Sequence, residues 1–325
     1  MNLNLYNEDM ERIAIIGNNF VSCLWSEGYN SVEPFCLEVR ATSGYKEKIR
    51  PDLYVGRDDR KTLMVIKTVE SKENLIVASG KQATRVLDDV AFVGTLDAGT
   101  IIDTGVSDAY NESAKFHNLS FARTDLGIRY NNQISNKSFL KLCETMCKSE
   151  DVGFRVVRQS KGLVAEFYRP EQKGKIKLSE PFGNVKIKKV LLSTEGYKNC
   201  AIVLGDGEGS ERTRIDVDLS DGESRREMIV DARDIRREEN ELAESYNNRL
   251  YARGLEKLLT QTKACEFSIL PLAKEFGTKY DLGDILEIVL SDYNIKLEAR
   301  VSRFTQKEQK NQIETIVEIG NIVMR

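Results

Sequence analysis

Apolar and polar residues alternate near the C-terminal end of the chain, from Ile295 to Val301 and again from Ile313 to Ile319. A period of two places one face of a strand in a core and the other in water, so both segments are predicted to be half-buried antiparallel strands. The nearly continuous apolar run Ile285–Leu290 predicts a more deeply buried strand before them. The charged segment Gln306–Asn311 is expected to be a hairpin loop. Three neighbouring strands need further strands to close a core.

The N-terminal part supplies such strands. Short apolar or alternating segments separated by turns predict strands over 13–16, 20–25, 35–39, 54–57, 62–69 and 74–78. Regularly spaced short strands are typical of a small barrel or sandwich. The segment Gly80–Val90 has its apolar residues on one helical face and predicts a short helix, and Gly94–Asp108, rich in Gly, Thr and Asp, is expected to be a connection.

The middle of the chain changes character. A helix is predicted over Ser138–Ser149, followed by a hairpin of Gly153–Arg158 and Leu163–Tyr168, which together indicate a small α+β module. Further strands are predicted over 184–192, 199–204, 215–219 and 265–270, and the strands of 184–219 are expected to share a sheet with those of 265–320. A long helical segment, Asp231–Thr262, interrupts them and is expected to bend at Gly254.

These elements predict a mainly β protein with α+β insertions. We expect two antiparallel β-barrel domains with a small α+β module and a long helical excursion. The domain boundaries follow the changes in pattern: a first barrel with a short flanking helix in 1–112, an inserted α+β module in 113–178, and a second barrel in 179–325 interrupted by the helical segment 223–264.

Composition narrows the function classes. The 325 residues are 41% hydrophobic and 30% charged, as in soluble folded proteins, and the net charge of -3 gives no general attraction to nucleic acid or anionic membranes. No segment approaches the roughly 20 apolar residues of a membrane span, and the N-terminus lacks the basic start of a signal peptide. We therefore expect synthesis in a reducing cytoplasm, no membrane insertion, and six cysteines that remain free, mostly buried thiols.

Candidate chemistry is sparse. The glycine-rich segment 205–209 follows a strand, as a phosphate-binding loop would, but a strand and not a helix comes after it, which favours a turn that uses the positive φ of glycine. His117 is the only histidine and lies in no nucleophile motif. The acidic pairs at 58–59, 88–89 and 238–239 are expected on solvated faces. No catalytic, cofactor-binding or metal-binding residue is predicted.

Two further features have competing interpretations. The charged block Arg225–Glu244 is either an ion-pair surface between subunits or an exposed helix face with internal ion pairs. Trp25, the only tryptophan, is expected in a barrel core and not on a ligand-binding surface.

Several segments, taken in order, resemble phage tail baseplate hub and tail-tip proteins of the siphovirus ReqiPepy type. They are FVSCLW and FCLEV in 20–39, LYVGRDDRKTLMVI in 53–66, NLIVASGKQATRVLDDV in 74–90, GDGEGSERTRI in 205–215, MIVDARDI in 228–235, YARGLEKL in 251–258, YDLGDILEI in 280–288, EARVSRF in 298–304 and ETIVEIG in 314–320. The resemblance covers most of the chain and is weakest over 110–150.

The resemblance implies a structural role without enzyme activity or a cofactor. Hubs of this type carry two β-barrels per chain, and three chains form a ring of pseudo-sixfold symmetry that joins the tail tube to the spike or tail tip. The implied partners are two further copies of the chain, the tail tube or distal tail protein, a spike, tail-tip or fibre protein, and the tape measure protein and DNA that pass through the channel. The implied location is a virion or phage-like particle.

An alternative function is a tail-associated cell-wall hydrolase, with the 113–178 module as its catalytic part. The single histidine and the small size of that module argue against it.

Overall fold

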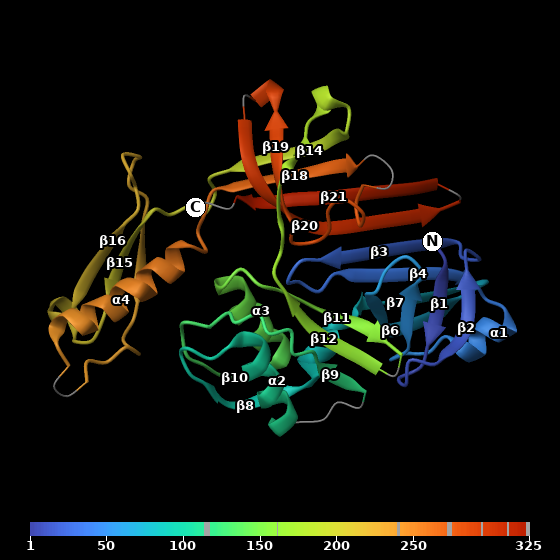
Figure 1. Ribbon diagram of the computed structural model, residues 1–325, viewed down its shortest axis with the longest axis horizontal. Helices are drawn as coiled ribbons and strands as arrows, with labels where there is room; N and C mark the ends of the chain where they lie inside the picture. The colour runs from blue at the N-terminus through green and yellow to red at the C-terminus, as the bar shows by residue number, and fades with distance from the viewer. Residues whose placement is uncertain are drawn as a thin grey trace. The chain divides into compact units, whose positions relative to one another are not determined.

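The computed structural model describes residues 1–113, 118–160, 162–238, 241–271, 275–293, 295–310 and 312–322. The chain forms two compact units, one made of Met1–Lys189 and Phe267–Arg325 and the other of Val190–Glu266. Strands dominate the first unit, as the sequence pattern predicts, and the second unit combines three strands with one helix (Figure 1). The expected boundaries at 112/113 and 178/179 stay a prediction.

The first unit is built around a thirteen-stranded sheet with the order β14-β18-β21-β20-β3-β4-β7-β6-β5-β1-β2, in which β19 pairs with β20 and β13 with β19. Its N-terminal strands are β1 (Leu3–Tyr6), β2 (Arg12–Gly17), β3 (Ser22–Gly28), β4 (Pro34–Arg40), β5 (Tyr54–Arg57), β6 (Leu63–Lys72) and β7 (Leu75–Gln82). Its C-terminal strands are β13 (Gln172–Leu178), β14 (Val185–Ser193), β18 (Ala264–Pro271), β19 (Ile285–Leu290), β20 (Ile295–Gln309) and β21 (Gln312–Ile322).

The long strand β20 joins these two groups. Its first part pairs with β19, and its second part, Arg303–Gln309, lies antiparallel between β21 and the N-terminal strand β3. The N-terminal and C-terminal strands therefore share one sheet, where the sequence pattern had suggested two separate ones. Pairing among the described strands follows an open path from β14 to β2, without a closed barrel.

The predicted hairpin loop over Gln306–Asn311 is wrong. Strand β20 continues to Gln309, which lies opposite Gln312, and the reversal occurs at Lys310, whose φ is +49°. Alternation was not recognisable in the sequence because both faces of β20 carry polar side chains at this end. On one of these faces Glu308 forms an ion pair with the N-terminal amino group of Met1.

The remainder of the first unit is an α+β module. It contains α2 (Ile102–Ser113) and α3 (Phe139–Ser149), the 3₁₀ helix η1 (Ala83–Asp89), and strands β8 (Ala91–Leu96), β9 (Leu119–Phe121), β10 (Ile134–Ser138), β11 (Gly153–Gln159) and β12 (Gly162–Tyr168). The unit also has the short helices α1 (Ser43–Lys48), η2 (Glu180–Phe182) and η4 (Ser291–Tyr293). Strands β8 and β10 form one small sheet, and β11, β12 and β9 another.

The predicted helix at 138–149 is confirmed, and Ser138 caps it by accepting a hydrogen bond from the backbone N–H of Lys141. The predicted connection at 94–108 is wrong, because β8 and the start of α2 occupy it. Helix α2 buries Ile102, Val106 and Tyr110 at helical spacing. The spacing of these three apolar residues was not recognised in the sequence, because glycine and polar residues lie between them.

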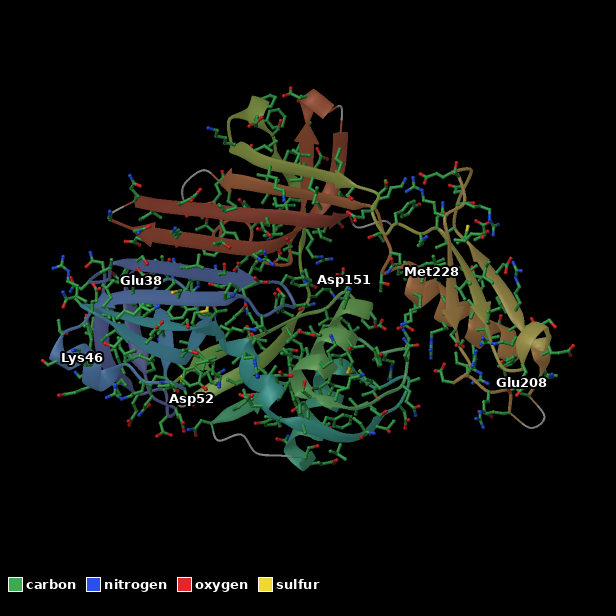
Figure 2. All side chains as sticks on the ribbon, turned by 180° about the vertical axis from the view of Figure 1, so that it is seen from behind. Glu38, Lys46, Asp52, Asp151, Glu208 and Met228 are labelled. Atoms are coloured by element: carbon green, nitrogen blue, oxygen red, sulfur yellow. The ribbon has the colours of Figure 1, made fainter. Side chains whose placement is uncertain are left out.

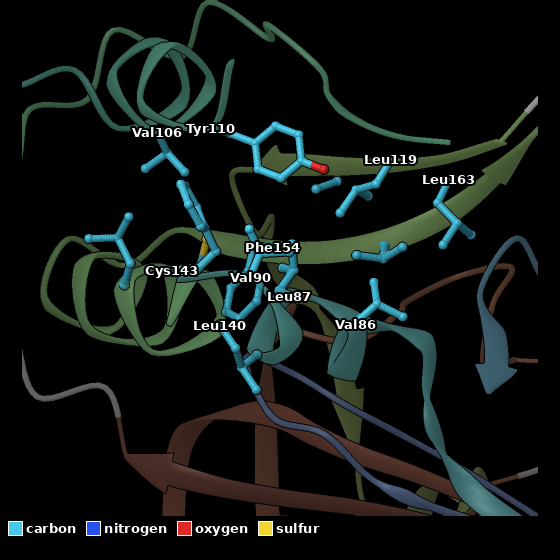
Figure 3. Close-up of a cluster of buried hydrophobic side chains, with 14 of the residues drawn as sticks. Val86, Leu87, Val90, Val106, Tyr110, Leu119, Leu140, Cys143, Phe154 and Leu163 are labelled. Atoms are coloured by element: carbon cyan, nitrogen blue, oxygen red, sulfur yellow. The ribbon is translucent and has the colours of Figure 1, made fainter. Parts of the chain in front are cut away.

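One hydrophobic core connects the module to the N-terminal strands. Figure 3 shows Val106 and Tyr110 of α2 with Cys143 of α3 and Phe154 of β11 in this core. Tyr6, Tyr54, Leu63 and Val65 from the N-terminal strands belong to the same cluster. The module and the first strands therefore depend on each other for burial of their apolar side chains.

The second unit is a three-stranded sheet covered on one face by a helix. Its strands are β15 (Cys200–Leu204), β16 (Arg214–Asp218) and β17 (Glu227–Asp231), its helix is α4 (Ala243–Leu258), and η3 (Gly209–Glu211) lies between β15 and β16. Strand β15 is central, antiparallel to β16 and parallel to β17. Of the strands predicted in 184–219, β14 joins the large sheet as expected, whereas β15 and β16 do not.

The predicted helix over 231–262 is too long at its N-terminal end. Asp231 ends strand β17, and its carboxylate pairs with Arg212 at 2.6 Å instead of capping a helix. Helix α4 begins after Leu242 and turns Tyr246, Leu250 and Leu258 toward the sheet. The β-branched run before Asp231 explains why that segment is a strand.

Gly254 in α4 is required for close packing on this sheet. A Cβ atom at Gly254 would lie 2.6 Å from Cγ2 of Val203 and 2.7 Å from Cγ2 of Val217. The glycine thus lets the helix backbone approach the branched side chains of β15 and β16.

We predict that Gly254→Val destabilises the second unit by about 2–3 kcal/mol, because the added atoms overpack the helix–sheet contact. Gly44→Ala is the control, since Gly44 lies in α1 with open space around the added Cβ, and it should change stability by less than about 1 kcal/mol. Urea unfolding followed by circular dichroism measures both. Equal stability of the two variants would contradict this packing role.

Candidate functional surface

The candidate site is one face of the sheet formed by β21-β20-β3-β4-β7-β6, the polar sheet face. Cross-strand register places the following side chains on it: Ser22, Leu24 and Ser26 of β3; Cys36, Glu38 and Arg40 of β4; Thr68, Glu70 and Lys72 of β6; Leu75, Val77, Ser79 and Lys81 of β7; Thr305, Lys307 and Gln309 of β20; and Gln312, Glu314 and Ile316 of β21. The alternate residues of the same strands point the other way.

The opposite face of these strands is largely apolar and buried, except at the polar end of β20 and around Glu27. Trp25, Phe35, Leu37, Ala78 and Val317 are each at most 2% exposed. Trp25 is therefore a core residue, as expected, and its ring meets Phe35 edge to face. This two-sided pattern is that of an antiparallel sheet with one face in a core and one directed outward.

The polar sheet face is held by hydrogen bonds between strands and carries charges of both signs. The hydroxyls of Ser26 and Thr305 lie 2.7 Å apart across the β3–β20 pair. Ser22 donates to Glu38 at 2.9 Å, and Figure 2 shows Glu38 on this part of the first unit. The mixture of lysine, arginine and glutamate with small hydroxyl side chains gives a hydrated surface without a strong net potential.

Directly beneath this sheet lies an ion-pair cluster of Glu27, Arg60 and Asp281, in which the exposed fraction rises from 0% for Glu27 to 12% for Arg60 and 41% for Asp281. Arg60 donates to both carboxylate oxygens of Glu27, at 3.0 and 2.8 Å, and pairs with Asp281 at 3.1 Å. The Glu27 side chain is fully buried and also accepts a hydrogen bond of 2.7 Å from the indole of Trp25. The cluster connects β3, the β5–β6 turn and the segment before β19.

Aromatic rings complete this cluster. The Arg60 guanidinium lies 5.0 Å from the ring centre of Phe276 and 5.6 Å from that of Phe304 on β20. The two phenylalanine rings stack with centres 4.3 Å apart. A cation over desolvated aromatic faces is stabilised further, so the rings strengthen the same connection.

The pKa of Glu27 reflects this environment. Burial acts to raise it, but the charge and hydrogen bonds of Arg60, with the hydrogen bond from Trp25, outweigh burial and hold the pKa below its usual value of 4.5. The carboxylate is therefore charged at neutral pH and contributes stability in that form.

A second polar connection joins β20 to the α+β module. Arg300 is 6% exposed, donates to the carbonyl oxygen of Gly283 at 2.7 Å and forms an ion pair with Asp151. Its guanidinium also lies 4.8 Å from the ring centre of Tyr29. The middle of β20 is thus held by two arginines, Arg300 within the strand and Arg60 over the ring of Phe304.

The structure shows where most of the candidate functional residues named from the sequence lie. The 205–209 segment is a turn with Gly207 and Gly209 at positive φ, and the backbone N–H of Asp206 donates to the Tyr246 hydroxyl at 2.7 Å. This confirms the turn interpretation. His117 lies outside the described residues. No group of side chains that could hold a metal ion occurs among the described residues.

The remaining candidates are engaged within the chain. Asp59 and Asp89 pair with Arg57 and Arg85. The described cysteines are free, and burial raises the pKa of Cys23 to about 12; nothing is described of the Cys265 side chain. The block Arg225–Glu244 is part strand and part loop, not one helix face, and its described ion pairs are internal, such as that of Arg249 with Glu241 at 2.7 Å.

Glu27 and Arg60 were not identified from the sequence. Arg60 lies in a charged turn that reads as solvated, and its burial depends on residues more than two hundred positions away. One local signal exists: Glu27 follows Trp25 by two residues in a strand, which places both side chains on the same, buried face.

The model of the family described as Siphovirus ReqiPepy6 Gp37-like protein matches residues 2–321. The chain belongs to this family. The resemblance seen in the sequence is thereby confirmed. No curated protein sequence matches the chain.

Solved structures share the fold over nearly the whole length. A prophage tail protein from Listeria monocytogenes EGD-e matches with a TM-score of 0.61 at 12% identity, over 99% of this chain and 94% of that one. The 43 kDa tail protein of prophage MuSo2 from Shewanella oneidensis matches with a TM-score of 0.63 at 13% identity, over 98% of both chains. The tail protein from Neisseria meningitidis MC58 matches with a TM-score of 0.62 at 8% identity, over 98% and 96%.

We predict that Arg60→Met lowers the free energy of unfolding by about 3–5 kcal/mol, because it leaves the Glu27 carboxylate buried without its cation. Lys72→Met is the matched control: Lys72 pairs with Glu70 at 2.9 Å, but both are more than half exposed, and the loss should be below about 1 kcal/mol. Chemical denaturation measures both. The double variant Glu27→Gln, Arg60→Met should recover part of the loss, and its failure to do so would contradict the pairing.

The lowered pKa of Glu27 predicts a specific acid dependence. Its contribution to stability is fully present above the unfolded-state pKa near 4.5 and is lost as the pH falls through the lower pKa of the folded state. The stability difference between the natural protein and Glu27→Gln should therefore be largest at neutral pH and shrink in acid. Denaturation curves across the acid range test this, and a difference that is constant with pH would be the contrary result.

Proposed function

We propose that this chain is a structural hub subunit of a phage or phage-like tail, and that three copies form a ring between the tail tube and the spike or tail tip. The observation that carries the proposal is the family membership together with a fold shared, end to end, with prophage tail proteins. The proposed role is mechanical and does not require a catalytic residue.

The construction of the first unit supports a ring with pseudo-sixfold character. Seven N-terminal strands and six C-terminal strands make two halves of one sheet, joined where β20 pairs with β3. We propose that each half corresponds to one barrel-like domain, so three chains present six such halves. This arrangement lets a threefold ring match a sixfold tube.

The polar sheet face supports a channel wall. In the proposed ring this face lines the channel through which the tape measure protein and DNA pass. A strongly basic wall would bind the phosphate backbone and retain DNA, whereas the polar sheet face carries lysine and arginine beside glutamate and hydroxyl side chains. The buried opposite face gives the wall its rigidity.

The proposed partners follow from this position. The tail tube or distal tail protein contacts one rim of the ring, and the spike, tail-tip or fibre protein contacts the other. Within the described residues no helix has the length and apolar character needed to cross a membrane. We propose that the chain works in the assembled particle, at the tail tip or baseplate.

Mass photometry of the purified chain tests the proposal. We expect a species of three times the 36.9 kDa chain mass, either alone or after addition of the tail tube protein of the same particle. Added tube protein should increase the trimer fraction if the tube organises the ring. A chain that stays monomeric in both samples and is absent from purified particles would overturn the proposal.

A further inference from the structure

Strand β17 in the second unit has one unpaired edge. It pairs with β15 without a bulge, and among the described strands it has no second neighbour. The backbones of Arg226 and Ala232 bond to β15, so alternate residues between them point their N–H and C=O groups the opposite way. The backbone groups of Glu227, Ile229 and Asp231 therefore face outward.

The side chains on this strand are unusual for a free edge. Figure 2 marks Met228 on β17; Met228 packs against the core under α4, whereas the neighbouring Ile229 points away from α4 and is 70% exposed. Natural sheets protect free edges with lysine, proline or bulges, and residues 227–231 contain none of these. The edge is short and has a charged residue at each end, but the exposed isoleucine at its centre is suited to pairing with a strand from another chain.

Carboxylates flank Ile229 on the same face of the sheet. Glu227 and Asp231 each meet an arginine of this unit, Arg225 at 3.0 Å and Arg212 at 2.6 Å, yet their side chains remain 49% and 58% exposed. The whole segment 190–266 contains seventeen acidic and twelve basic residues, a net charge of -5. The negative net charge of the segment favours a basic partner, and the two carboxylates remain accessible to it although Arg233 also lies 3.5 Å from Asp231.

A second copy of the same edge is a poor occupant. Antiparallel pairing of two β17 strands centred on Ile229 would place Glu227 of one copy directly opposite Asp231 of the other, at both ends. Like charges directly opposite each other destabilise a strand pair. The outer edge of β16 is no better, because its central outward side chain, Asp216, would face Ile229.

We propose that β17 is a docking edge for an extended segment of another protein, which adds a fourth strand to this sheet. The segment carries an apolar residue opposite Ile229 and a lysine or arginine two positions to either side, opposite Glu227 and Asp231. Backbone hydrogen bonds supply affinity, and the apolar residue with its two flanking cations sets the specificity. This inference does not depend on the proposed ring.

The test uses the full chain and two seven-residue peptide probes, Thr-Lys-Thr-Val-Thr-Lys-Thr and the same peptide with glutamate in place of both lysines. We expect the lysine probe to bind at least about tenfold more tightly, as opposite charges across a strand pair require, and to slow hydrogen exchange at the Ile229 amide. Ile229→Lys should abolish binding. Leu259→Lys, at a residue of the same unit that is 64% exposed, should leave it unchanged.

A charge-reversed variant tests the same edge without changing Ile229, in case Ile229→Lys disturbs folding. Glu227→Lys with Asp231→Lys should reverse the preference, so that the glutamate probe binds more tightly. Equal binding of both probes, or no binding and no change in exchange at Ile229, would overturn the proposal. Concentration-dependent dimers that Ile229→Lys abolishes would also overturn it, since they would identify a second copy as the occupant.

Discussion

The pairing of β20 with β3 is the interaction on which the rest of the first unit depends. It brings together residues about 280 positions apart in the chain, and contacts at such separation require the largest loss of chain entropy before they gain any stability. Ion pairs next to the β20–β3 pair offset part of this entropy cost. Arg60 connects Glu27 on β3 to Asp281, and Arg300 connects the other half of β20 to the α+β module. The seam is thus held by backbone hydrogen bonds, two buried arginines and stacked rings.

This seam lets the first unit present one continuous polar face. Because side chains alternate along each strand, one register places Trp25 and Phe304 in the core and Ser26 and Thr305 on the polar sheet face, where Thr305 is partly exposed and Ser26 is buried beside it. A slip of one residue would exchange the two faces. The buried Glu27–Arg60 pair adds to the specification of the register, since only the observed pairing brings Glu27, Phe304 and Asp281 around one guanidinium. The residues that would line the proposed channel are therefore positioned by an ion pair that does not itself lie on the channel surface.

Local pattern in the sequence predicted most elements, and distant pairing accounts for most errors. The strands of 13–16, 35–39 and 285–290 and the helix of 138–149 follow from periodicity and capping. The joining of the two strand groups through β20 could not be predicted, because nothing in a single strand specifies its neighbour. The polar end of β20 was mistaken for a loop since both of its faces are polar there. Strand β17 was missed because its residues fall in the segment 223–264, which was predicted to be helical.

For the polar sheet face too, local sequence pattern predicted part of the result and distant strand pairing determined the rest. Alternation predicted one polar face for each strand, but the identity of the residues that share the polar sheet face required the register of six strands. The family itself was recognisable from ordered short segments, and the match over residues 2–321 confirms it. The exposed Ile229 was not identified because its segment was predicted to be helical, where a single apolar residue carries little information.

A cryo-electron microscopy reconstruction of the chain in an assembled tail tests the central claim most directly. The account predicts three copies around the tail axis, with β3 still paired to β20 and with Lys307, Ser79 and Glu38 facing the channel. A reconstruction in which this face packs against another protein, or lies on the outside of the particle, would contradict the account.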